Sequence, residues 1–373
     1  MKNLLALLLI AVFFIGCSEK MIVITPDKKE VEEKKVILLP PPVEDDEIIT
    51  EPMIEEKVEK EESIYKKIAL IYPSKVVGPY AKTTVNTLTS YLLYLNLPFK
   101  LETFDSIDES VENINTQISL LKEQGYEKVI ALYTQAGFEV LNIHDDLYDL
   151  EIYFPLINKN EIVTQKDNFV FGGISYTRQL ELLHSVASQN NSMFYVESYI
   201  GNKLKDAYTS IFGMDVNIKE IERANNQYKY IMDDERLKES TVMLNTPIIK
   251  SSIIMSQLTA YEVNPIAILS TQINYNPLLI KLTQDIDRTN FFVVNSIGKS
   301  DDYLQEYTNL LEADIVYNWV DYSSLVGVNY LINKDGDINI VDTTVEENQA
   351  LYKPYLFKST SYGFEKLSGL EEN

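Results

Sequence analysis

A short apolar stretch, Lys67-Ile68-Ala69-Leu70-Ile71-Tyr72, decides the fold class of this chain, and Pro73 ends it. Its apolar residues run without a break, which is typical of a strand buried on both faces of a parallel sheet. Residues 83–95 then repeat apolar side chains at helical spacing, and residues 99–104 alternate as a second strand. This order of strand, helix and strand predicts a βαβ unit.

The same rhythm continues to about residue 294. We expect further strands and helices in alternation, and the length favours two parallel sheets of five strands over one sheet of ten. Ser106 is the expected N-cap of a helix at 106–124, since Glu109 follows three residues later. Residues 330–332 and 338–340 flank an Asp-Gly pair, which predicts a late β-hairpin. The other expected strands are 129–133, 152–157, 169–174, 193–196, 216–221, 242–244, 266–269 and 291–294, and the other helices are 136–143, 177–187, 202–212, 248–261 and 278–287.

The N-terminus has the pattern of an export signal. Lys2 precedes an apolar run at 4–15, which is too short to span a bilayer comfortably as a helix. The following Gly16-Cys17 completes a stretch that resembles the lipobox of bacterial lipoproteins. The resemblance implies a signal peptide at 1–16, removed before a lipidated Cys17, and the Ser18 after it favours the periplasmic side of the outer membrane. Cys17 is the only cysteine of the chain, so an internal disulfide is excluded.

Residues 17–65 are expected to form a lipidated cysteine followed by a disordered linker. The segment 19–62 carries a net charge of −8, and its prolines, which include a run at 40–42, resist helix formation. It contains too little apolar surface to offset the entropy of ordering. A solvated spacer is favoured over a specific binding tail. The body that follows carries most of the remaining charge of a chain whose total is −23, which argues against nucleic-acid binding.

Three short patterns in the body resemble the type I periplasmic binding proteins of the leucine/isoleucine/valine-binding group. They are residues 68–73 with the later Gly78-Pro79-Tyr80-Ala81, residues 168–171 with Gln179, and residues 194–196 with Tyr199-Ile200-Gly201. The resemblance implies two Rossmann-like lobes joined by a hinge, with a loop ending in Gly-Pro before the first helix. Lobe 1 would then comprise 66–176 with about 291–330, and lobe 2 would comprise 177–290 with about 331–373.

Within that group the chain looks most like the envelope lipoproteins that activate penicillin-binding proteins. The shared features are the lipid anchor, the spacer, the late hairpin and an aromatic-basic stretch at 353–358. The large N-terminal helical-repeat region of the best-known members is missing, so the resemblance does not name a partner.

The residues give little support for catalysis. The two histidines, His144 and His184, have no second metal ligand at a suitable spacing. There is no nucleophile elbow and no phosphate-binding loop. The Asp335-Gly336-Asp337 run lacks the rest of a calcium loop, so a turn is the better interpretation. The sequence therefore predicts no enzyme, no metal and no cofactor.

A ligand of such a fold would meet the carboxyl ends of the strands. Hydroxyl, amide and aromatic side chains at those positions suit a small polar ligand, although ordinary polar loops explain them equally well. Glu197 is the nearest acidic candidate for the ammonium group of an amino acid. The predicted cleft residues are Ser74, Tyr80, Thr134, Gln135, Tyr176, Asn245 and Asn274.

Three functions fit these patterns. The leading hypothesis is a membrane-anchored, non-enzymatic lipoprotein that binds another envelope protein and regulates or scaffolds peptidoglycan machinery. The alternative is a lipid-anchored receptor for a small polar solute such as an amino acid. The third is a structural part of an envelope machine such as a flagellar motor.

Overall fold

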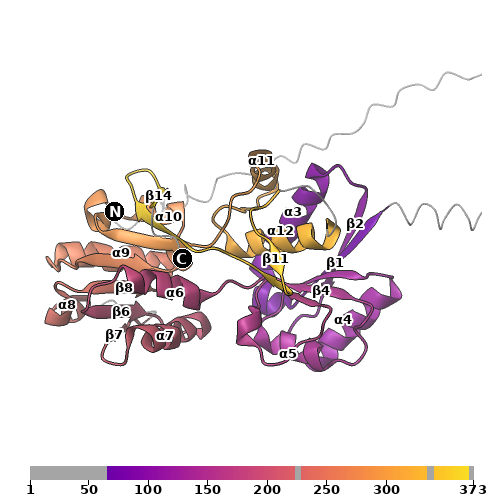
Figure 1. Cartoon of the computed structure of the whole chain (residues 1–373), viewed down its shortest axis with the longest axis horizontal. Coiled ribbons are helices and arrows are strands. Elements are labelled where there is room, and N and C mark those ends of the chain that lie inside the picture. The colour runs from indigo at the N-terminus through magenta and orange to yellow at the C-terminus, as the bar shows by residue number, and fades with distance from the viewer. Residues whose placement is uncertain (1–64, 223–227, 334–339, 369–373) are drawn as a thin grey trace, which may run out of the picture. The chain divides into compact units, whose positions relative to one another are not determined.

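The computed structural model describes residues 65–222, 228–333 and 340–368, which form two α/β lobes (Figure 1). Each lobe is built on one seven-stranded sheet with helices on both faces. The predicted two-lobed α/β fold with parallel sheets is therefore confirmed. The predicted signal peptide at 1–16, the lipidation site at Cys17 and the linker up to residue 64 lie outside the described residues.

Both sheets contain five parallel strands in the same order. In lobe 1 the order is β2-β1-β3-β4-β5, and in lobe 2 it is β7-β6-β8-β9-β10. Two short strands from the C-terminal part of the chain extend each sheet at one edge. The strands of lobe 1 are β1 Lys66–Tyr72, β2 Phe99–Asp105, β3 Lys128–Ala131, β4 Glu151–Phe154, β5 Phe169–Phe171, β11 Val345–Glu346 and β12 Gln349–Ala350. Those of lobe 2 are β6 Asn191–Tyr195, β7 Asn217–Glu220, β8 Thr241–Asn245, β9 Ala267–Ser270, β10 Phe291–Asn295, β13 Tyr355–Ser359 and β14 Phe364–Lys366.

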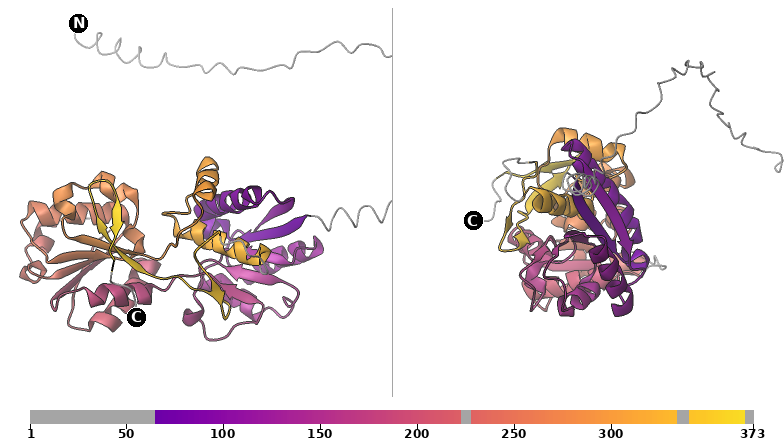
Figure 2. Two further views of the ribbon diagram at one scale, coloured as in Figure 1. Left: turned by 45° about the horizontal axis from the view of Figure 1, so that its top comes forward. Right: turned by 90° about the vertical axis from the view of Figure 1, so that its right-hand side faces the viewer.

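Strand β1 is buried on both faces, as its apolar run predicts. Ile68 and Leu70 belong to the core under two helices on one side of the sheet, and Ala69 and Ile71 belong to the core on the other side. Figures 1 and 2 show α3 and α12 on one face and α4 and α5 on the other. The helices of lobe 1 are α3 Ser74–Tyr94, α4 Val111–Glu123, α5 Gln135–Ile143, α11 Asp302–Leu310 and α12 Trp319–Ile332, with the short helix η1 at Lys159–Glu161.

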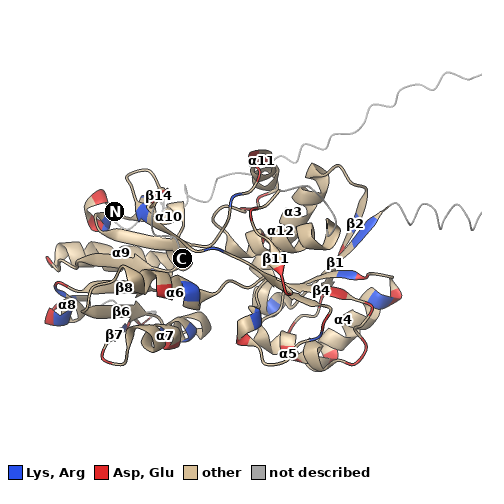
Figure 3. Ribbon diagram, viewed as in Figure 1, with Lys and Arg blue, Asp and Glu red and all other residues tan. Residues whose placement is uncertain are grey.

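Lobe 2 repeats this arrangement. Met193 of β6 packs with α6 and α7 on one face, and the neighbouring Phe194 packs with α8, α9 and α10 on the other. Figure 3 shows α3, α9 and α12 almost free of charged residues. The helices are α6 Tyr176–Ser185, α7 Tyr199–Phe212, α8 Tyr228–Met232, α9 Ile248–Ala260 and α10 Pro277–Leu282, with short helices η2 Glu235–Leu237, η3 Gln272–Asn274 and η4 Asp285–Arg288.

Two helices, α3 and α4, begin five or more residues from the predicted start. Helix α3 begins at Ser74 and runs through Gly78 and Pro79, so the expected loop before the first helix is wrong. The N–H groups of Ser74 and Lys75 donate to the Asp105 side chain and the Ile107 carbonyl, which satisfies two donors of the first turn, and Pro79 lies inside the helix.

Helix α4 begins at Val111 rather than at Ser106. Ile107 has a positive φ of 67°, which interrupts helical geometry. The Ser106 hydroxyl donates to the carbonyls of Tyr72 and Asp108 instead of capping a helix. The predicted N-cap is therefore wrong, because this serine fastens the loop to β1.

The predicted late hairpin is wrong in its first strand. Residues 330–332 are the last turn of α12, a helix buried nearly all round, and such a helix carries no periodicity that separates it from a strand. Most of the predicted turn and second strand lies outside the described residues. A two-residue hairpin instead joins β11 to β12, where Glu347 and Asn348 both have positive φ.

The chain passes between the lobes three times, after β5, after β10 and after β12. The structure places β10 in the sheet of lobe 2, where Phe291 pairs with Ile268 of β9. It places β11 and β12 in the sheet of lobe 1. The predicted lobe limits at about 291 and 331 therefore shift, because an apolar strand does not reveal which of two sheets it joins.

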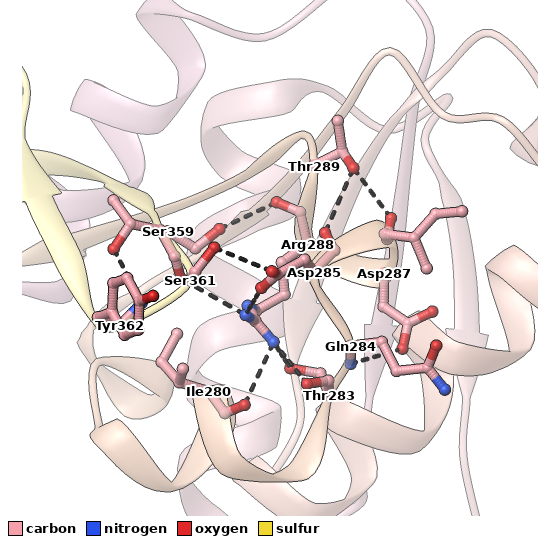
Figure 4. Close-up of polar contacts among 12 residues, drawn as sticks. Ile280, Thr283, Gln284, Asp285, Asp287, Arg288, Thr289, Ser359, Ser361 and Tyr362 are labelled. Carbon is pink, nitrogen blue, oxygen red and sulfur yellow. Dashed lines mark hydrogen bonds and ion pairs between the residues drawn. The ribbon is translucent and has the colours of Figure 1, made fainter.

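The second C-terminal hairpin, β13–β14, is fastened to lobe 2 by Arg288 (Figure 4). This guanidinium is 3% exposed and donates to carbonyls of Ile280, Thr283 and Thr360. It also forms an ion pair with Asp285, which in turn accepts a hydrogen bond from Ser361. The C-terminal part of the chain is thus bound to both sheets.

Candidate functional site

In each sheet the strand order reverses direction at one point, between β1 and β3 in lobe 1 and between β6 and β8 in lobe 2. Ligands of open α/β sheets bind at the carboxyl ends of strands beside such a reversal. Helices α3 and α5 begin at this point in lobe 1, and α7 and α9 begin at it in lobe 2. The topology therefore defines one candidate edge in each lobe.

A cavity of about 290 Å³ lies at the edge of lobe 1 and also touches α6 and α7 of lobe 2. Most of its wall is aliphatic or aromatic, and its charged residues are one glutamate and one lysine. Two tyrosines in the wall, Tyr80 and Tyr199, come from opposite lobes and are 48% and 69% exposed. The wall is formed by Val77, Tyr80, Thr134, Gln135, Leu156, Ile157, Glu161, Ile162, Ile174, Tyr176, Tyr199, Ile200, Lys203, Trp319 and Val320.

Four of the seven predicted cleft residues line this cavity, namely Tyr80, Thr134, Gln135 and Tyr176. The structure thus brings together side chains from α3, from the start of α5 and from the start of α6. Burial raises the pKa of the Tyr176 hydroxyl far above its usual value, and the nearby Tyr80 and Glu161 add to this. Tyr176 therefore stays neutral and offers a hydroxyl rather than a charge.

The other three predicted residues do not line the cavity. Ser74 is the first residue of α3, and its N–H donates to Asp105 at 3.0 Å. Asn245 and Asn274 are 2% and 0% exposed and lie inside lobe 2. Glu197, the predicted partner of an ammonium group, is exposed and also lies away from the cavity wall.

Two carboxylates of the chain already lie at the helix N-termini of the lobe 1 edge. Asp105 accepts the N–H groups of Ser74 and Ile107 at 3.0 and 2.7 Å. Burial raises the pKa of Asp105, but hydrogen bonds from Ser74 and Ile107 outweigh it and leave the pKa below its usual value. Glu109 accepts both the N–H and the hydroxyl of Thr134, each at 2.7 Å, at the start of α5. The positive ends of both helix dipoles are therefore compensated from within the protein.

At the corresponding edge of lobe 2, buried amide side chains join the strand ends. The amide of Gln179 donates to Gln272 at 3.0 Å and to the Ser296 hydroxyl at 2.8 Å, and it accepts the Gln272 N–H. The amide of Asn274 donates to Ser270 and to the carbonyls that end β8. Amides that look like ligand contacts in the sequence therefore join strand ends to each other.

One ion pair connects the two lobes beside the cavity. The Lys203 ammonium of α7 lies 2.6 Å from the Glu161 carboxylate of η1, and both side chains are 32% exposed. The cavity wall thus contains both charged groups as a mutually neutralised pair. A charged ligand group would have to displace one of them.

Sequence reasoning missed Glu161, Lys203 and Trp319 as cavity residues. Each lies on an element far along the chain from α3. The local sequence pattern does not indicate that these residues reach the cavity. Tyr199 does carry a signal, because it belongs to a pattern that resembles the binding-protein family. The burial pattern of one helix or strand does not show which distant elements it meets across a cavity.

Among the described residues, no group of three or more His, Cys, Asp or Glu side chains is placed to hold a metal ion. No helix in the same part of the chain is long and apolar enough to cross a membrane.

No protein-family model and no curated protein matches the sequence, but the structure resembles many solved structures. A branched-chain amino acid transporter protein from Rhodospirillum rubrum matches with a TM-score of 0.59 at 12% identity, over 81% of this chain and 100% of that one. The C-domain of LpoA from Haemophilus influenzae, described as a regulator of PBP1A, matches with 0.53 at 11% identity over the same shares. LivJ from Streptococcus pneumoniae, solved in complex with isoleucine, matches with 0.55 at 8% identity, again over 81% and 100%.

The described residues therefore have the fold of type I periplasmic binding proteins, as the sequence predicts. Proteins with this fold include receptors for amino acids and a regulator of a penicillin-binding protein. At identities of 8–12% the likeness concerns the fold alone. The choice between a solute and a protein partner rests on the geometry of the cavity.

Proposed function

We propose that this chain is a non-enzymatic binding protein of the bacterial envelope. It is anchored at the periplasmic side of the outer membrane through acylated Cys17. Its two-lobed body binds another envelope protein and regulates or scaffolds peptidoglycan machinery. The observation that carries the proposal is the pair of carboxylates, Asp105 and Glu109, at the starts of α3 and α5.

Free amino acids fit this cavity poorly. Their carboxylate would approach helix ends that Asp105 and Glu109 already neutralise, and like charges would repel it. Their ammonium group would find Glu161 as the single acidic side chain in the wall, and Lys203 already binds it. The starts of α3 and α5 therefore offer no partner to the carboxylate of an amino acid, and Glu161 is already paired where its ammonium group would bind.

The cavity suits an uncharged apolar or aromatic group, such as a side chain presented by a protein. Tyr80, Tyr199 and Trp319 supply exposed or half-buried aromatic surface of the kind enriched at protein interfaces. The LpoA C-domain supports a protein partner, since a protein with this fold is described as a regulator of PBP1A.

The second candidate function is a receptor for a small uncharged solute. It is favoured by the aromatic wall together with the Thr134 hydroxyl and the Gln135 amide, which could orient such a ligand. The structure of LivJ with isoleucine shows that this fold can enclose a small molecule.

Two measurements on the full-length lipoprotein separate the candidates. We expect no saturable thermal shift with the twenty amino acids, with muropeptides or with small uncharged aromatic solutes, and capture of an envelope protein by a photo-crosslinker placed at Tyr199. A saturable rise of several degrees with one ligand class would overturn the protein-binding proposal in favour of the receptor. Tyr230 on α8, which is 76% exposed, is the control position for capture.

The anchor is tested separately. Cells labelled with a palmitate analogue should label the wild-type protein, and Cys17→Ser should abolish labelling and release the body from the membrane fraction. Labelling that survives the substitution would overturn the assignment of Cys17.

A further inference from the structure

Helix α11 buries one face within lobe 1 and leaves much of an adjoining apolar face exposed. Leu304 and Thr308 are fully buried. The adjoining face carries Tyr303, Tyr307 and Leu310, which are 70%, 44% and 80% exposed and lie at i, i+4 and i+7. This spacing puts the three side chains in one stripe along the helix.

The stripe continues onto α3. The Ser90 hydroxyl donates to the carbonyl of Tyr307 at 3.3 Å, and the rings of Tyr94 and Tyr307 meet edge to face at 6.0 Å. Leu93, one turn beyond Ser90, is 49% exposed. We call the surface of Leu93, Tyr94, Tyr303, Tyr307 and Leu310 the α11 face.

The α11 face is held rigidly. Asp301 caps α11 by accepting the N–H groups of Tyr303 and Leu304 at 2.9 and 3.2 Å. Burial raises the pKa of the Tyr94 hydroxyl, and a hydrogen bond with the same Asp301 adds to this shift. A fixed surface loses little conformational entropy when a partner binds.

Negative charge flanks the α11 face. Asp302 and Glu306 lie on α11 itself, and Asp301 precedes it. The helix contains no lysine or arginine, and Glu312, which follows it, is paired with Lys82 at 3.1 Å and adds no net charge. An apolar stripe with acids beside it fits a partner whose apolar side chains are flanked by basic ones.

We propose that the α11 face binds a basic amphipathic segment of an envelope protein, an inference that rests on the proposed function. The charge argues against other occupants. The chain's own segment 19–62 carries −8 and a second copy carries −23, so both would be repelled. An anionic lipid surface would be repelled for the same reason.

The test places a photo-crosslinker at position 303 of the full-length lipoprotein in its own membrane. We expect capture of an envelope protein, and mass spectrometry should map the crosslink to a segment rich in Lys or Arg among apolar residues. Asp302→Lys with Glu306→Lys should reduce the capture at least tenfold. The matched control is Glu181→Lys with Asp206→Lys in lobe 2, two exposed acids whose reversal changes the net charge equally and should leave capture intact. Thermal unfolding of each variant verifies that it is folded.

Several outcomes would overturn the inference. They are a captured segment that is acidic or belongs to this chain, equal capture from the control position Tyr230, and equal loss in the control charge reversal. Capture from Tyr199 in the cavity but not from position 303 overturns the α11 face alone. No capture from either position overturns the proposed function as well.

Discussion

The two lobes share one strand order but use its carboxyl edge in different ways. In lobe 1 the edge borders a cavity, and carboxylates of Asp105 and Glu109 lie at its helix N-termini. In lobe 2 buried amides bind each other and the strand ends, and a cavity of about 320 Å³ lies farther along the edge beside Asn295. Topology therefore sets where a site can form, and side-chain hydrogen bonding decides whether that place is open to a ligand.

The largest effect should come from breaking the buried amide network of lobe 2. Gln179→Ala removes three hydrogen bonds of a fully buried amide and leaves Gln272 and Ser296 without their partner. We expect a loss of about 2–4 kcal/mol in the free energy of unfolding, measured by urea denaturation. The matched control is Gln135→Ala at the exposed edge of lobe 1, which should change it by less than about 0.5 kcal/mol. Equal losses would contradict the contrast between the lobes.

The next effect concerns a buried carboxyl in lobe 1. Burial raises the pKa of Asp321 to about 6, although the Asp314 N–H donates to it at 3.0 Å. The unfolded chain loses this proton near its ordinary pKa of 3.8, whereas the folded chain keeps it to about pH 6. Stability should therefore fall by about 2–3 kcal/mol as pH rises from about 4 to about 6.

Asp321→Asn should remove that part of the pH dependence, because the amide does not titrate. Urea unfolding of both proteins at several pH values between 4 and 7 measures the difference. Parallel curves for the wild type and the variant would show that Asp321 titrates normally.

Lobe 2 contains a carboxylate with the opposite behaviour. The side chain of Asp234 is 16% exposed, and hydrogen bonds from Arg236 and then Lys219 hold its pKa well below the usual value of 3.8. Its contribution is therefore complete above about pH 4 and is lost as pH falls further. Asp234→Asn should cost about 1–2 kcal/mol of unfolding free energy at pH 7 and much less near pH 2. A cost that does not change with pH would contradict the ion pairing.

The fold was predictable because its signals are local. The unbroken apolar run at 67–72 and the later alternation of strands and helices imply parallel sheets without reference to contacts. The predictions failed where residues far along the chain determine the local structure. Asp105 and Ile107 allow α3 to begin before Pro79, and all-round burial hides the helical period of residues 330–332.

The candidate site was predictable only in part. The rule that ligands meet strand ends points to Tyr80, Thr134 and Gln135, which do line the cavity. The same rule cannot separate them from Asn274, since the sequence does not show that a buried network already uses its amide. Whether the lining residues contact a ligand stays a prediction.

The smallest effect should come from the ion pair that joins the lobes. Lys203 and Glu161 lie 2.6 Å apart, but both are about one-third exposed, so water and salt screen their attraction. A double-mutant cycle with Lys203→Met and Glu161→Gln should give a coupling energy of only about 0.2–1 kcal/mol in the free energy of unfolding. The coupling should shrink further in high salt. A value well above this range would mean that the pair holds the lobes together rather than marking the rim of the cavity, and the cavity would then be part of a structural junction.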